Sequence, residues 1–319
     1  MDENVFQGME YVYAVYKEGS FQKAAQKMFI SQPSVSASVR RVEERVGCRL
    51  FDRSVKPLRL TECGERYIAA VEQIYQMGRE FSEYVNDWGG LRRGSLRLGG
   101  SSLFSSLVLP SVMSAFHQKY PNVQMDLAEE TTTKLEEMLQ QGTVDLVLDY
   151  QIPNSGLYDA RTLEEDALLL AVPASFEVNR GLERYRISAG QMGPSVLQQV
   201  PAVPLECFKG QPFIMLKQDN DTRKRADELC AEQGFEAGAA LEFDQQMTAY
   251  LVSRTGAGIS FVSSTLVSRV EPGDALAFYR LAGSRSRRKV CFFWKRGRYL
   301  TRAMEEFMQL ASGLHEKAV

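Results

Sequence analysis

The segment from residue 20 to residue 61 constrains the fold of this 319-residue chain most, because it predicts two short helices, a tight turn and a basic wing. Ser20 stands where a helix N-cap is expected. Apolar residues then follow at helical spacing on one face: Phe21, Ala24, Ala25 and Met28. Phe29 and Ile30 are expected to fill the turn, and Ser31 to cap the second helix. This is helix-turn-helix spacing, in which the second helix can enter a groove of DNA.

The second helix of this segment has two contrasting faces. An apolar stripe is expected to face the core: Val35, Val39, Val42 and Val46. The opposite face is small and polar at its start and basic later: Pro33, Ser34, Ser36, Ala37, Arg40 and Arg41. Pro33 is tolerated because the N–H groups of the first helical turn have no partner within the helix. Small residues allow close approach to base edges, hydroxyls bond to bases or phosphates, and arginines bind phosphate.

The local net charge favours DNA binding by this segment over an ordinary solvated surface. Residues 20–60 contain nine basic and three acidic residues, a local net charge of +6 in a chain whose total is −2. Surface serines and arginines usually form a solvated helix face, and two short amphipathic helices occur in many folds that do not bind DNA. A positive block within a mildly acidic chain favours contact with phosphates over that alternative.

The same segment carries a set of landmarks at fixed spacing: Gly19-Ser20-Phe21, Ala24-Ala25, Ser31-Gln32-Pro33-Ser34-Val35-Ser36, Glu43, Gly47, Leu50-Phe51, Arg53, Leu60-Thr61 and Gly64. With them it resembles the winged helix-turn-helix of the LysR-type transcriptional regulators, and the similarity extends more weakly over nearly the whole chain. The resemblance implies a dimer or tetramer that binds promoter DNA and responds to a small effector. By position, Gln32, Pro33 and Ser36 match the base-contacting sites of the family, and Arg53 matches its wing residue. The expected DNA contacts are therefore Ser31, Gln32, Pro33, Ser34, Ser36, Arg40, Arg41 and Arg53.

A narrow apolar stripe follows the wing and predicts a long helix from Glu62 to Trp88. Its members step alternately by four and three residues, with a glycine as the one gap: Tyr67, Val71, Ile74, Gly78, Phe81, Val85 and Trp88. Such a stripe favours pairing with a second copy, and the family uses this linker helix for dimerisation. The alternative is a helix packed on its own domain. Gly89-Gly90 and Arg92-Arg93-Gly94 mark the boundary with the next domain.

From Ser95 onward, strands alternate with helices, which predicts parallel α/β units. The expected strands are 95–99, 123–129, 145–149, 167–172, 213–216, 239–243, 258–262, 276–280 and 289–294. The expected helices are 108–119, 133–141, 222–233, 246–254 and 299–314. This part resembles the family's effector-binding domain, which is built like a periplasmic binding protein with a ligand cleft between two subdomains.

The predicted architecture is α+β overall. It consists of a winged helix-turn-helix over residues 1–61, a linker helix over 62–90 and an effector-binding domain over 95–319. Within that domain, subdomain I is expected over 95–165 and 266–319, and subdomain II over 166–265. The segment 173–213 is longer than is usual for the family, and Ser263 stands where a proline is usual. Whether the long segment is an ordered insertion or a flexible cover is left open.

Three loops between a strand and a helix are expected to contact the effector, because ligands of α/β sheets bind at the carboxyl ends of strands beside helix N-termini. The candidates in these loops are Ser101, Ser102, Thr131, Thr132, Gln218, Asn220 and Thr222. Hydroxyls and backbone N–H groups suit a carboxylate or another small anion. Asp219 and Asp221 would repel an anion unless Lys217 or Arg223 offsets them. The alternative role for these Ser and Thr residues is helix capping, which can coexist with ligand contact.

The five cysteines are scattered and contain no CxxC pair, so neither a disulfide scaffold nor a structural zinc site is expected, and buried or half-buried free thiols are favoured. With only two histidines, His117 and His315, a histidine-based metal site is not expected either. In the peroxide-sensing branch of the family, the resolving cysteine matches Cys230, but the attacking cysteine falls on Asp221. Sulfenate chemistry then lacks its first step, although Cys207 nearby keeps a redox role open.

Two other classes of function are weaker. An enzyme would need a catalytic constellation, and the sequence has no Ser-His-Asp set, phosphate loop or metal cluster, so neither catalysis nor a cofactor beyond the effector is expected. A transport binding protein would need an export signal, which the acidic start does not resemble, and no apolar run is long enough to span a bilayer. The expected protein is a cytoplasmic regulator whose partners are double-stranded promoter DNA, further copies of itself and, indirectly, RNA polymerase. The effector, the target genes, activation or repression, and dimer or tetramer are left open.

Overall fold

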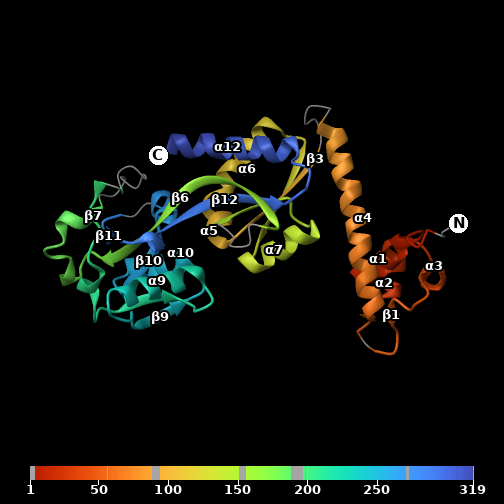
Figure 1. The fold of residues 1–319 in the computed structure, drawn as a ribbon, viewed down its shortest axis with the longest axis horizontal. Coiled ribbons are helices and arrows are strands. Elements are labelled where there is room, and N and C mark those ends of the chain that lie inside the picture. The colour runs from red at the N-terminus through yellow and green to blue at the C-terminus, as the bar shows by residue number, and fades with distance from the viewer. Residues whose placement is uncertain are drawn as a thin grey trace. The chain divides into compact units, whose positions relative to one another are not determined.

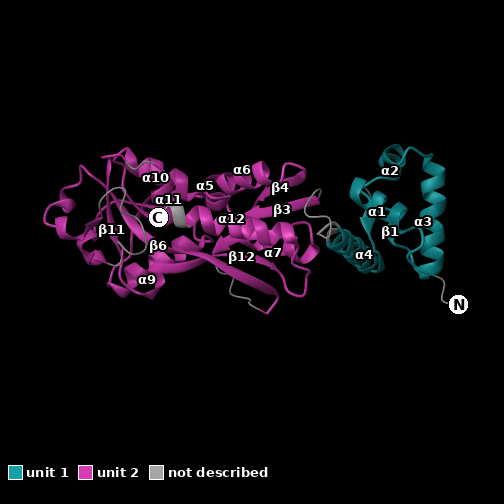
Figure 2. Cartoon of the chain, turned by 90° about the horizontal axis from the view of Figure 1, so that it is seen from above, with its two compact units in different colours: residues 1–85 teal, residues 86–319 magenta. Residues whose placement is uncertain are grey.

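The computed structural model describes residues 4–55, 57–87, 94–150, 156–187, 197, 199–270 and 273–318. The chain forms two compact units, residues 1–85 and 86–319, which we call unit 1 and unit 2 (Figures 1 and 2). Three features of the sequence prediction lie outside the described residues: Trp88 in the apolar stripe, and the boundary signals Gly89-Gly90 and Arg92-Arg93.

Unit 1 is a winged helix-turn-helix followed by a long helix (Figure 1). Its elements are α1 (Met9–Glu18), α2 (Phe21–Lys27), α3 (Gln32–Val46), β1 (Phe51–Asp52), β2 (Arg59–Leu60) and α4 (Glu62–Asp87). The two predicted caps are confirmed, since the Ser20 side chain accepts from the N–H of Lys23, and that of Ser31 from the N–H of Ser34. Strands β1 and β2 pair antiparallel and form the wing. In the turn, however, Phe29 is almost fully exposed instead of filling it.

The core of unit 1 joins all four helices and the wing. Its buried residues are Val12, Val15, Ala24, Ala25, Val35, Val39, Val42, Leu50, Phe51, Tyr67, Ile68 and Val71. At Gly64, a Cβ atom would lie 2.0 Å from the carbonyl oxygen of Leu50. Only glycine therefore allows α4 to approach the start of the wing this closely.

The apolar stripe of α4 divides into two parts. Tyr67 and Val71 are buried in the core of unit 1, so the alternative of packing on its own domain holds for the first half of the helix. Large apolar side chains of the second half are exposed: Met77 (61%), Phe81 (67%), Tyr84 (41%) and Val85 (52%). The exposed large apolar side chains of α4 therefore lie in its second half.

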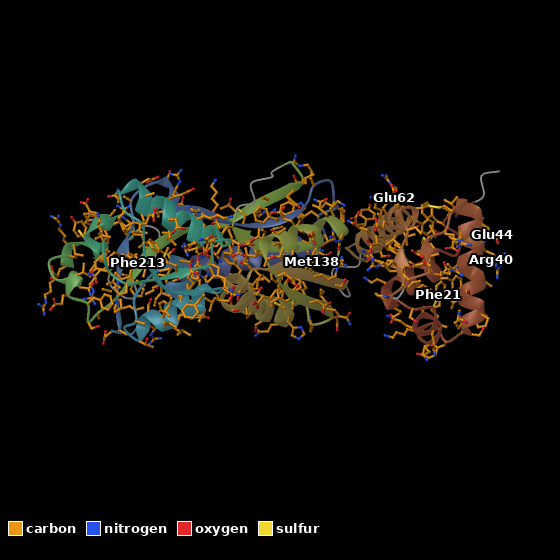
Figure 3. The ribbon with its side chains drawn as sticks, turned by 90° about the horizontal axis from the view of Figure 1, so that it is seen from below. Phe21, Arg40, Glu44, Glu62, Met138 and Phe213 are labelled. Atoms are coloured by element: carbon orange, nitrogen blue, oxygen red, sulfur yellow. A yellow bond between two sulfur atoms is a disulfide. The ribbon has the colours of Figure 1, made fainter. Side chains whose placement is uncertain are left out.

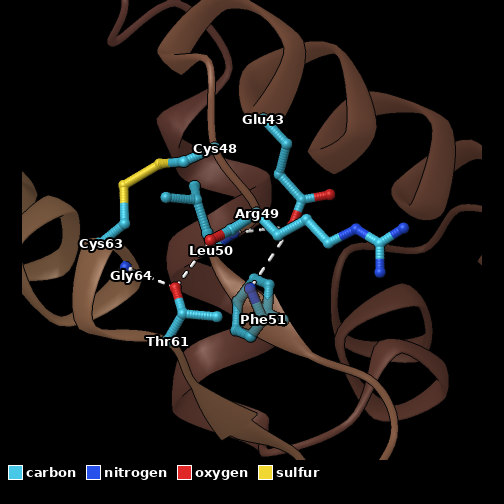
Figure 4. Close-up of a disulfide and its surroundings, with 8 residues drawn as sticks. All are labelled: Glu43, Cys48, Arg49, Leu50, Phe51, Thr61, Cys63 and Gly64. Atoms are coloured by element: carbon cyan, nitrogen blue, oxygen red, sulfur yellow. Dashed lines mark hydrogen bonds between the residues drawn. A yellow bond between two sulfur atoms is a disulfide. The ribbon is translucent and has the colours of Figure 1, made fainter.

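A disulfide joins Cys48, just after α3, to Cys63 in the first turn of α4 (Figure 4). The expectation of free thiols is therefore wrong for this pair, whereas Cys207, Cys230 and Cys291 are free. The two cysteines meet because the chain between them folds back: Thr61 donates its hydroxyl to the carbonyl of Arg49 (2.6 Å) and its N–H to that of Leu50 (3.0 Å). Their spacing in the sequence does not reveal this return.

The first sheet of unit 2 combines parallel and antiparallel strands. Strands β4 (Val123–Glu129), β3 (Gly94–Gly100) and β5 (Leu146–Tyr150) pair in parallel, and β12 (Arg287–Lys295) then pairs antiparallel to β5. Its helices are α5 (Ser102–Leu107), α6 (Leu109–Lys119), α7 (Thr132–Gln141) and α12 (Arg302–Ala318). Helices α6 and α12 pack against the sheet through one apolar core that includes Phe116, Phe292 and Phe307.

The long strand β6 (Tyr158–Pro173) belongs to both sheets of unit 2 (Figure 1). Its first part pairs antiparallel with β12, as far as Ala167 opposite Arg287, and its second part pairs antiparallel with two strands of the second sheet. That sheet comprises β7 (Arg186–Ile187), β8 (Phe213–Leu216), β9 (Ala239–Phe243), β10 (Ile259–Ser263) and β11 (Leu276–Arg280). Its helices are α9 (Asp221–Glu232), α10 (Gln246–Arg254) and α11 (Ser264–Arg269).

Two parts of the sequence prediction differ from this topology. The prediction of purely parallel units holds for β4-β3-β5 and for β10-β8-β9, but β6, β11 and β12 run antiparallel to their neighbours. Because β11 pairs with β6 and β7, it belongs to the second sheet, and the chain returns to the first sheet at Arg287, later than the predicted boundary at 265/266.

The long segment between β6 and β8 is an ordered insertion wherever the structure describes it. It contains the short 3-10 helices η1 (Glu177–Asn179), η2 (Glu183–Tyr185) and η3 (Leu205–Phe208). Apolar side chains of the segment are buried in the core of the second sheet: Leu182, Val203, Leu205 and Phe208. Residues 188–196 and 198 lie outside the described part.

We expect reduction of the Cys48–Cys63 disulfide to lower the free energy of unfolding of unit 1 by about 3 kcal/mol, since the cross-link closes a loop of about 15 residues in the unfolded chain. Thermal unfolding followed by circular dichroism, with and without dithiothreitol, measures the change. The Cys48→Ser variant should already show the loss and be insensitive to the reductant, while Cys207→Ser should behave like the wild type. Equal stability of both forms of the wild type would contradict the prediction.

Candidate nucleic-acid interface and ligand cleft

Helix α3 presents the predicted polar face to solvent. Of the eight predicted contact residues, all but Ser36, which is half-buried, are exposed: Ser31, Gln32, Pro33, Ser34, Arg40, Arg41 and Arg53. Val35, Val39 and Val42 on the opposite face are fully buried. Figure 3 shows Arg40 and Glu44 together on the outer side of this helix. The structure thus brings a polar, basic helical surface together as the sequence predicts.

Few interactions hold these side chains in the free protein. The hydroxyls of Ser31 and Ser34 lie 2.7 Å apart, and the Ser31 oxygen also accepts the N–H of Ser34. Arg40 donates from Nε to Glu44 Oε1 over 3.0 Å, and both side chains are mostly exposed. An exposed pair of this kind contributes little stability, so Arg40 can exchange Glu44 for a phosphate at small cost.

Glu43 connects the helix to the wing. Its Oε1 accepts the N–H groups of Leu50 (2.9 Å) and Phe51 (3.4 Å), and its Oε2 accepts Nη2 of Arg53 at 3.0 Å. The Arg53 guanidinium also lies 5.0 Å from the centre of the Phe21 ring. Glu43 and Phe21 therefore orient Arg53, which remains partly exposed, at the beginning of the wing. The sequence identified Glu43 only as a family landmark.

Unit 2 contains a cleft of about 1110 Å³ lined by residues of both sheets. Six of the seven predicted contacts line it: Ser101, Ser102, Thr131, Thr132, Asn220 and Thr222. Gln218 is exposed and does not belong to the lining. Further lining residues that the sequence analysis did not select include Tyr150, Lys224, Arg225, Gln246, Arg287 and Arg288.

Two of the predicted hydroxyls point to a carboxylate of the protein. Ser101 donates to Asp149 Oδ1 over 3.0 Å, and Thr132 donates to Asp149 Oδ2 over 2.8 Å. Burial raises the pKa of Asp149, although these hydrogen bonds and Arg288 act in the opposite direction. Thr131 and Asn220 act as N-caps, as the alternative interpretation holds, by accepting the N–H groups of Lys134 and Thr222.

Arg288 forms the floor of the cleft. Its guanidinium lies 3.1 Å from the centre of the Tyr150 ring, and donates to Asp221 Oδ2 (2.8 Å) and Thr222 Oγ1 (3.2 Å) at the start of α9. Its Nε donates to Asp166 Oδ2 over 3.4 Å. Burial lowers the pKa of Arg288, but Tyr150, Asp166 and Asp221 outweigh it and leave the pKa raised. A permanently charged side chain thus links the first sheet to α9 of the second.

Asp166, behind Arg288, is completely buried at the point where β6 leaves the first sheet. Its Oδ1 accepts the hydroxyls of Ser263 (2.6 Å) and Ser264 (3.0 Å), and both the N–H and the hydroxyl of Thr265 (3.0 Å each). The serine that replaces the family's usual proline therefore supplies one of the donors. Such dense hydrogen bonding is what a buried carboxylate requires.

The lining of the cleft carries charges of both signs. Acidic residues are Glu129, Glu130, Asp219, Asp221 and Asp244, and basic residues are Lys224, Arg225, Arg287, Arg288 and Lys289. Asp221 is already paired with Arg288, and Lys217 pairs with Asp244 at 2.7 Å. This mixture suits a polar ligand with both donors and acceptors better than a simple anion.

The free cysteines do not form a peroxide-sensing pair in the described structure. Asp221, at the position of the attacking cysteine, is engaged by Arg288. Burial raises the pKa of the Cys230 thiol to about 12, so almost no thiolate forms at neutral pH. Among the described residues, no cluster of His, Cys, Asp and Glu could hold a metal ion, and no helix is long and apolar enough to cross a membrane.

Comparison with known proteins matches both units. Residues 6–65 match the family model described as "Bacterial regulatory helix-turn-helix protein, lysR family", and residues 89–314 match "LysR substrate binding domain". The chain is 28% identical over 304 residues to the "Uncharacterized HTH-type transcriptional regulator YcgK" of Bacillus subtilis (strain 168), covering 95% of this chain and 92% of the relative. It is 26% identical over 296 residues to the "RuBisCO operon transcriptional regulator" of Allochromatium vinosum, covering 93% and 91%.

Solved structures share the fold at lower sequence identity. A full-length OxyR variant from Pseudomonas aeruginosa superimposes with a TM-score of 0.70 at 18% identity, covering 95% of this chain and 93% of the other. Full-length CbnR in complex with its target DNA superimposes with a TM-score of 0.62 at 18% identity, covering 98% and 99%. The chain therefore shares the fold of these full-length regulators.

We expect the buried carboxyl of Asp149 to make the stability of unit 2 depend on pH. Its pKa is raised above the ordinary value of 3.8, so folding takes up a proton and stability falls as the pH rises from 3.8 through the raised pKa. Asp149→Asn removes this dependence and should unfold at a higher temperature than the wild type at pH 8. Calorimetry from pH 4 to pH 8 measures this, with exposed Glu130→Gln as the control. A wild-type-like pH profile for Asp149→Asn would refute the assignment.

Proposed function

The chain belongs to the LysR family of transcriptional regulators, and we propose that it reads promoter DNA with the exposed face of α3 and is regulated by a small molecule in the cleft of unit 2. The observation that carries this proposal is the polar, basic surface of α3, held on an apolar core and continued by the wing. The complex of the structural relative CbnR with its target DNA supports the same use of unit 1.

Within this surface, two groups of residues have different roles. Gln32, Pro33 and Ser36 lie in the first turns of α3, where side chains reach base edges. Ser31, Ser34, Arg40, Arg41 and, in the wing, Arg53 bind phosphates and fix the register of the helix on the duplex. Base contacts specify the sequence, whereas phosphate contacts supply affinity that depends on salt.

The second half of α4 pairs two copies of the chain. Phe81 and Val85 of the predicted stripe are exposed, and Met77 and Tyr84, which lie outside that stripe, extend the exposed apolar surface at helical spacing. Such a surface suits a two-helix seam. LysR regulators are oligomers, and a dimer presents two reading heads to a site with approximate two-fold symmetry. A tetramer would add contacts beyond this seam.

The effector is a small polar molecule that binds between the two sheets and shifts the position of one relative to the other. Ser102, Lys224 and Gln246 line the cleft together with Arg288. Binding there changes the geometry of the oligomer and the bending of DNA, and acts on RNA polymerase only indirectly. This regulation takes place in the cytoplasm. An unchanged DNase footprint on a cognate promoter at saturating effector would contradict this part of the proposal.

Substitutions in α3 should separate base reading from phosphate binding. Gln32→Ala should relax the preference at one or two base pairs by about 1–3 kcal/mol, because a base contact is lost. Arg41→Ala should weaken binding to all sequences and reduce the slope of affinity against salt by about one, because one phosphate contact is lost. Fluorescence anisotropy on DNA selected by the wild-type protein and on random DNA measures both. Equal losses of Gln32→Ala on the two DNAs would count against base reading.

A charge in the exposed seam of α4 should disrupt the oligomer. Phe81→Glu places two carboxylates in an apolar interface, and we expect the dimer dissociation constant to rise by at least a hundredfold, or roughly 3 kcal/mol. Sedimentation velocity over a range of concentrations measures this. Glu80→Gln, the neighbouring position on the helix, is the control. A Phe81→Glu protein that sediments like the wild type would locate the interface elsewhere.

A further inference from the structure

The turn between α2 and α3 contains an unusual backbone conformation. Helix α2 ends with the N–H of Ile30 donating to the carbonyl of Ala25 (3.1 Å) and the N–H of Phe29 donating to that of Gln26 (3.2 Å). This pair of bonds is a Schellman motif, which requires a left-handed residue at the position of Phe29. Phe29 has a φ of 56°, and it is the only residue other than glycine with positive φ in the described part of the chain. Glycine is the usual residue here, because a side chain strains this conformation.

The side chain of Phe29 does not stabilise unit 1 by packing. It is 94% exposed, more than any other large apolar side chain that the structure describes. It belongs to neither the core of unit 1 nor the partly buried residues packed against that core, whereas Phe21 does. Backbone strain and an exposed phenyl ring both raise the free energy of the unbound protein. A phenylalanine at this position is therefore explained physically if its ring contributes to the free energy of binding a partner.

The position of Phe29 identifies the partner. It lies two residues before Ser31, the N-cap of α3, and three before Gln32. When the first turn of α3 enters a groove deeply enough for Gln32 to reach a base, the turn that precedes it approaches the duplex as well. The surroundings are basic, as contact with DNA requires. The exposed seam of α4, where a second copy of the chain would bind, begins only at Met77, far along another helix.

We propose that Phe29 is an apolar DNA contact that packs its ring against a thymine methyl group or a deoxyribose at the edge of the site read by α3. The inference rests on the proposed reading role of α3 and adds a residue to it. Thymine is the only base with a methyl group in the major groove, and apolar side chains recognise it there. Burial of a previously exposed ring then adds to affinity.

Three variants of Phe29 separate backbone strain from the contribution of the ring. Phe29→Gly relieves the strain and removes the ring, so its unfolding temperature should rise by a few degrees while its affinity for DNA falls about five- to tenfold. Phe29→Ala should lose the same affinity without the gain in stability. Phe29→Tyr keeps the ring and should bind like the wild type. The full chain is measured by calorimetry and by fluorescence anisotropy on a DNA site selected by the wild-type protein from a random library.

The DNA itself provides a further arm. A series of DNA sites is made in which one thymine at a time is replaced by uracil, which lacks the methyl group. If the wild type and Phe29→Gly bind one of these sites with equal affinity, the methyl group removed there is the contact of Phe29. A difference that persists at every position identifies the deoxyribose instead. Wild-type affinity of Phe29→Gly on unmodified DNA would overturn the inference, as would a loss confined to the oligomeric state in sedimentation. Failure of the wild type to select any DNA would refute the reading role of α3, which is a different outcome.

Discussion

The buried contact between Arg288 and Asp166 is the interaction on which the ligand-binding unit depends. Asp166 marks the point where β6 leaves the first sheet, and Arg288 extends from β12 to α9 of the second. Removal of Arg288 would leave the Asp166 carboxylate buried without this opposite charge, and removal of Asp166 would leave the buried guanidinium dependent on Asp221. Either change is more unfavourable than the loss of an exposed pair. The pair therefore fixes the base of the cleft, while the loops above it are free to differ in the ligands they accept.

In the DNA-binding unit, Glu43 has a comparable role on a smaller scale. One carboxylate accepts two backbone N–H groups at the start of the wing and the guanidinium of Arg53, so α3 and the wing are oriented together. The disulfide and the close approach of Gly64 to Leu50 then attach both to α4. The reading surface is consequently supported by four independent kinds of contact: apolar packing, hydrogen bonds, an ion pair and a covalent bond.

The sequence predicted local structure better than long-range contacts. Four strands, β4, β8, β9 and β11, begin and end at the predicted residues. Strand β8 is an apolar run, and β4 alternates apolar and polar residues, which are the two local patterns typical of strands. The first half of β6 was missed because it is rich in charge, including Asp159 and Glu165, and is stabilised by pairing with β12. Arg288, Asp166 and the Cys48–Cys63 pair could not be found from spacing, since topology alone brings them together. For the cleft, residue type and loop position located the lining, but not that Ser101 and Thr132 bond to Asp149.

The two parts of α4 lie on one continuous helix, so its length separates the reading head from the dimer seam of the proposed dimer. Its first turns are fixed in the core of the reading head by Tyr67 and Val71, and the exposed seam begins at Met77 on the same continuous helix. In the proposed dimer, α4 runs without a break from the winged helix-turn-helix to the exposed seam, so the helical rise sets the separation of the two reading heads. Insertion of one heptad would move each head by about 10 Å along its helix, or roughly three base pairs of DNA. In that dimer, the length of α4 between head and seam would set the spacing of the two half-sites.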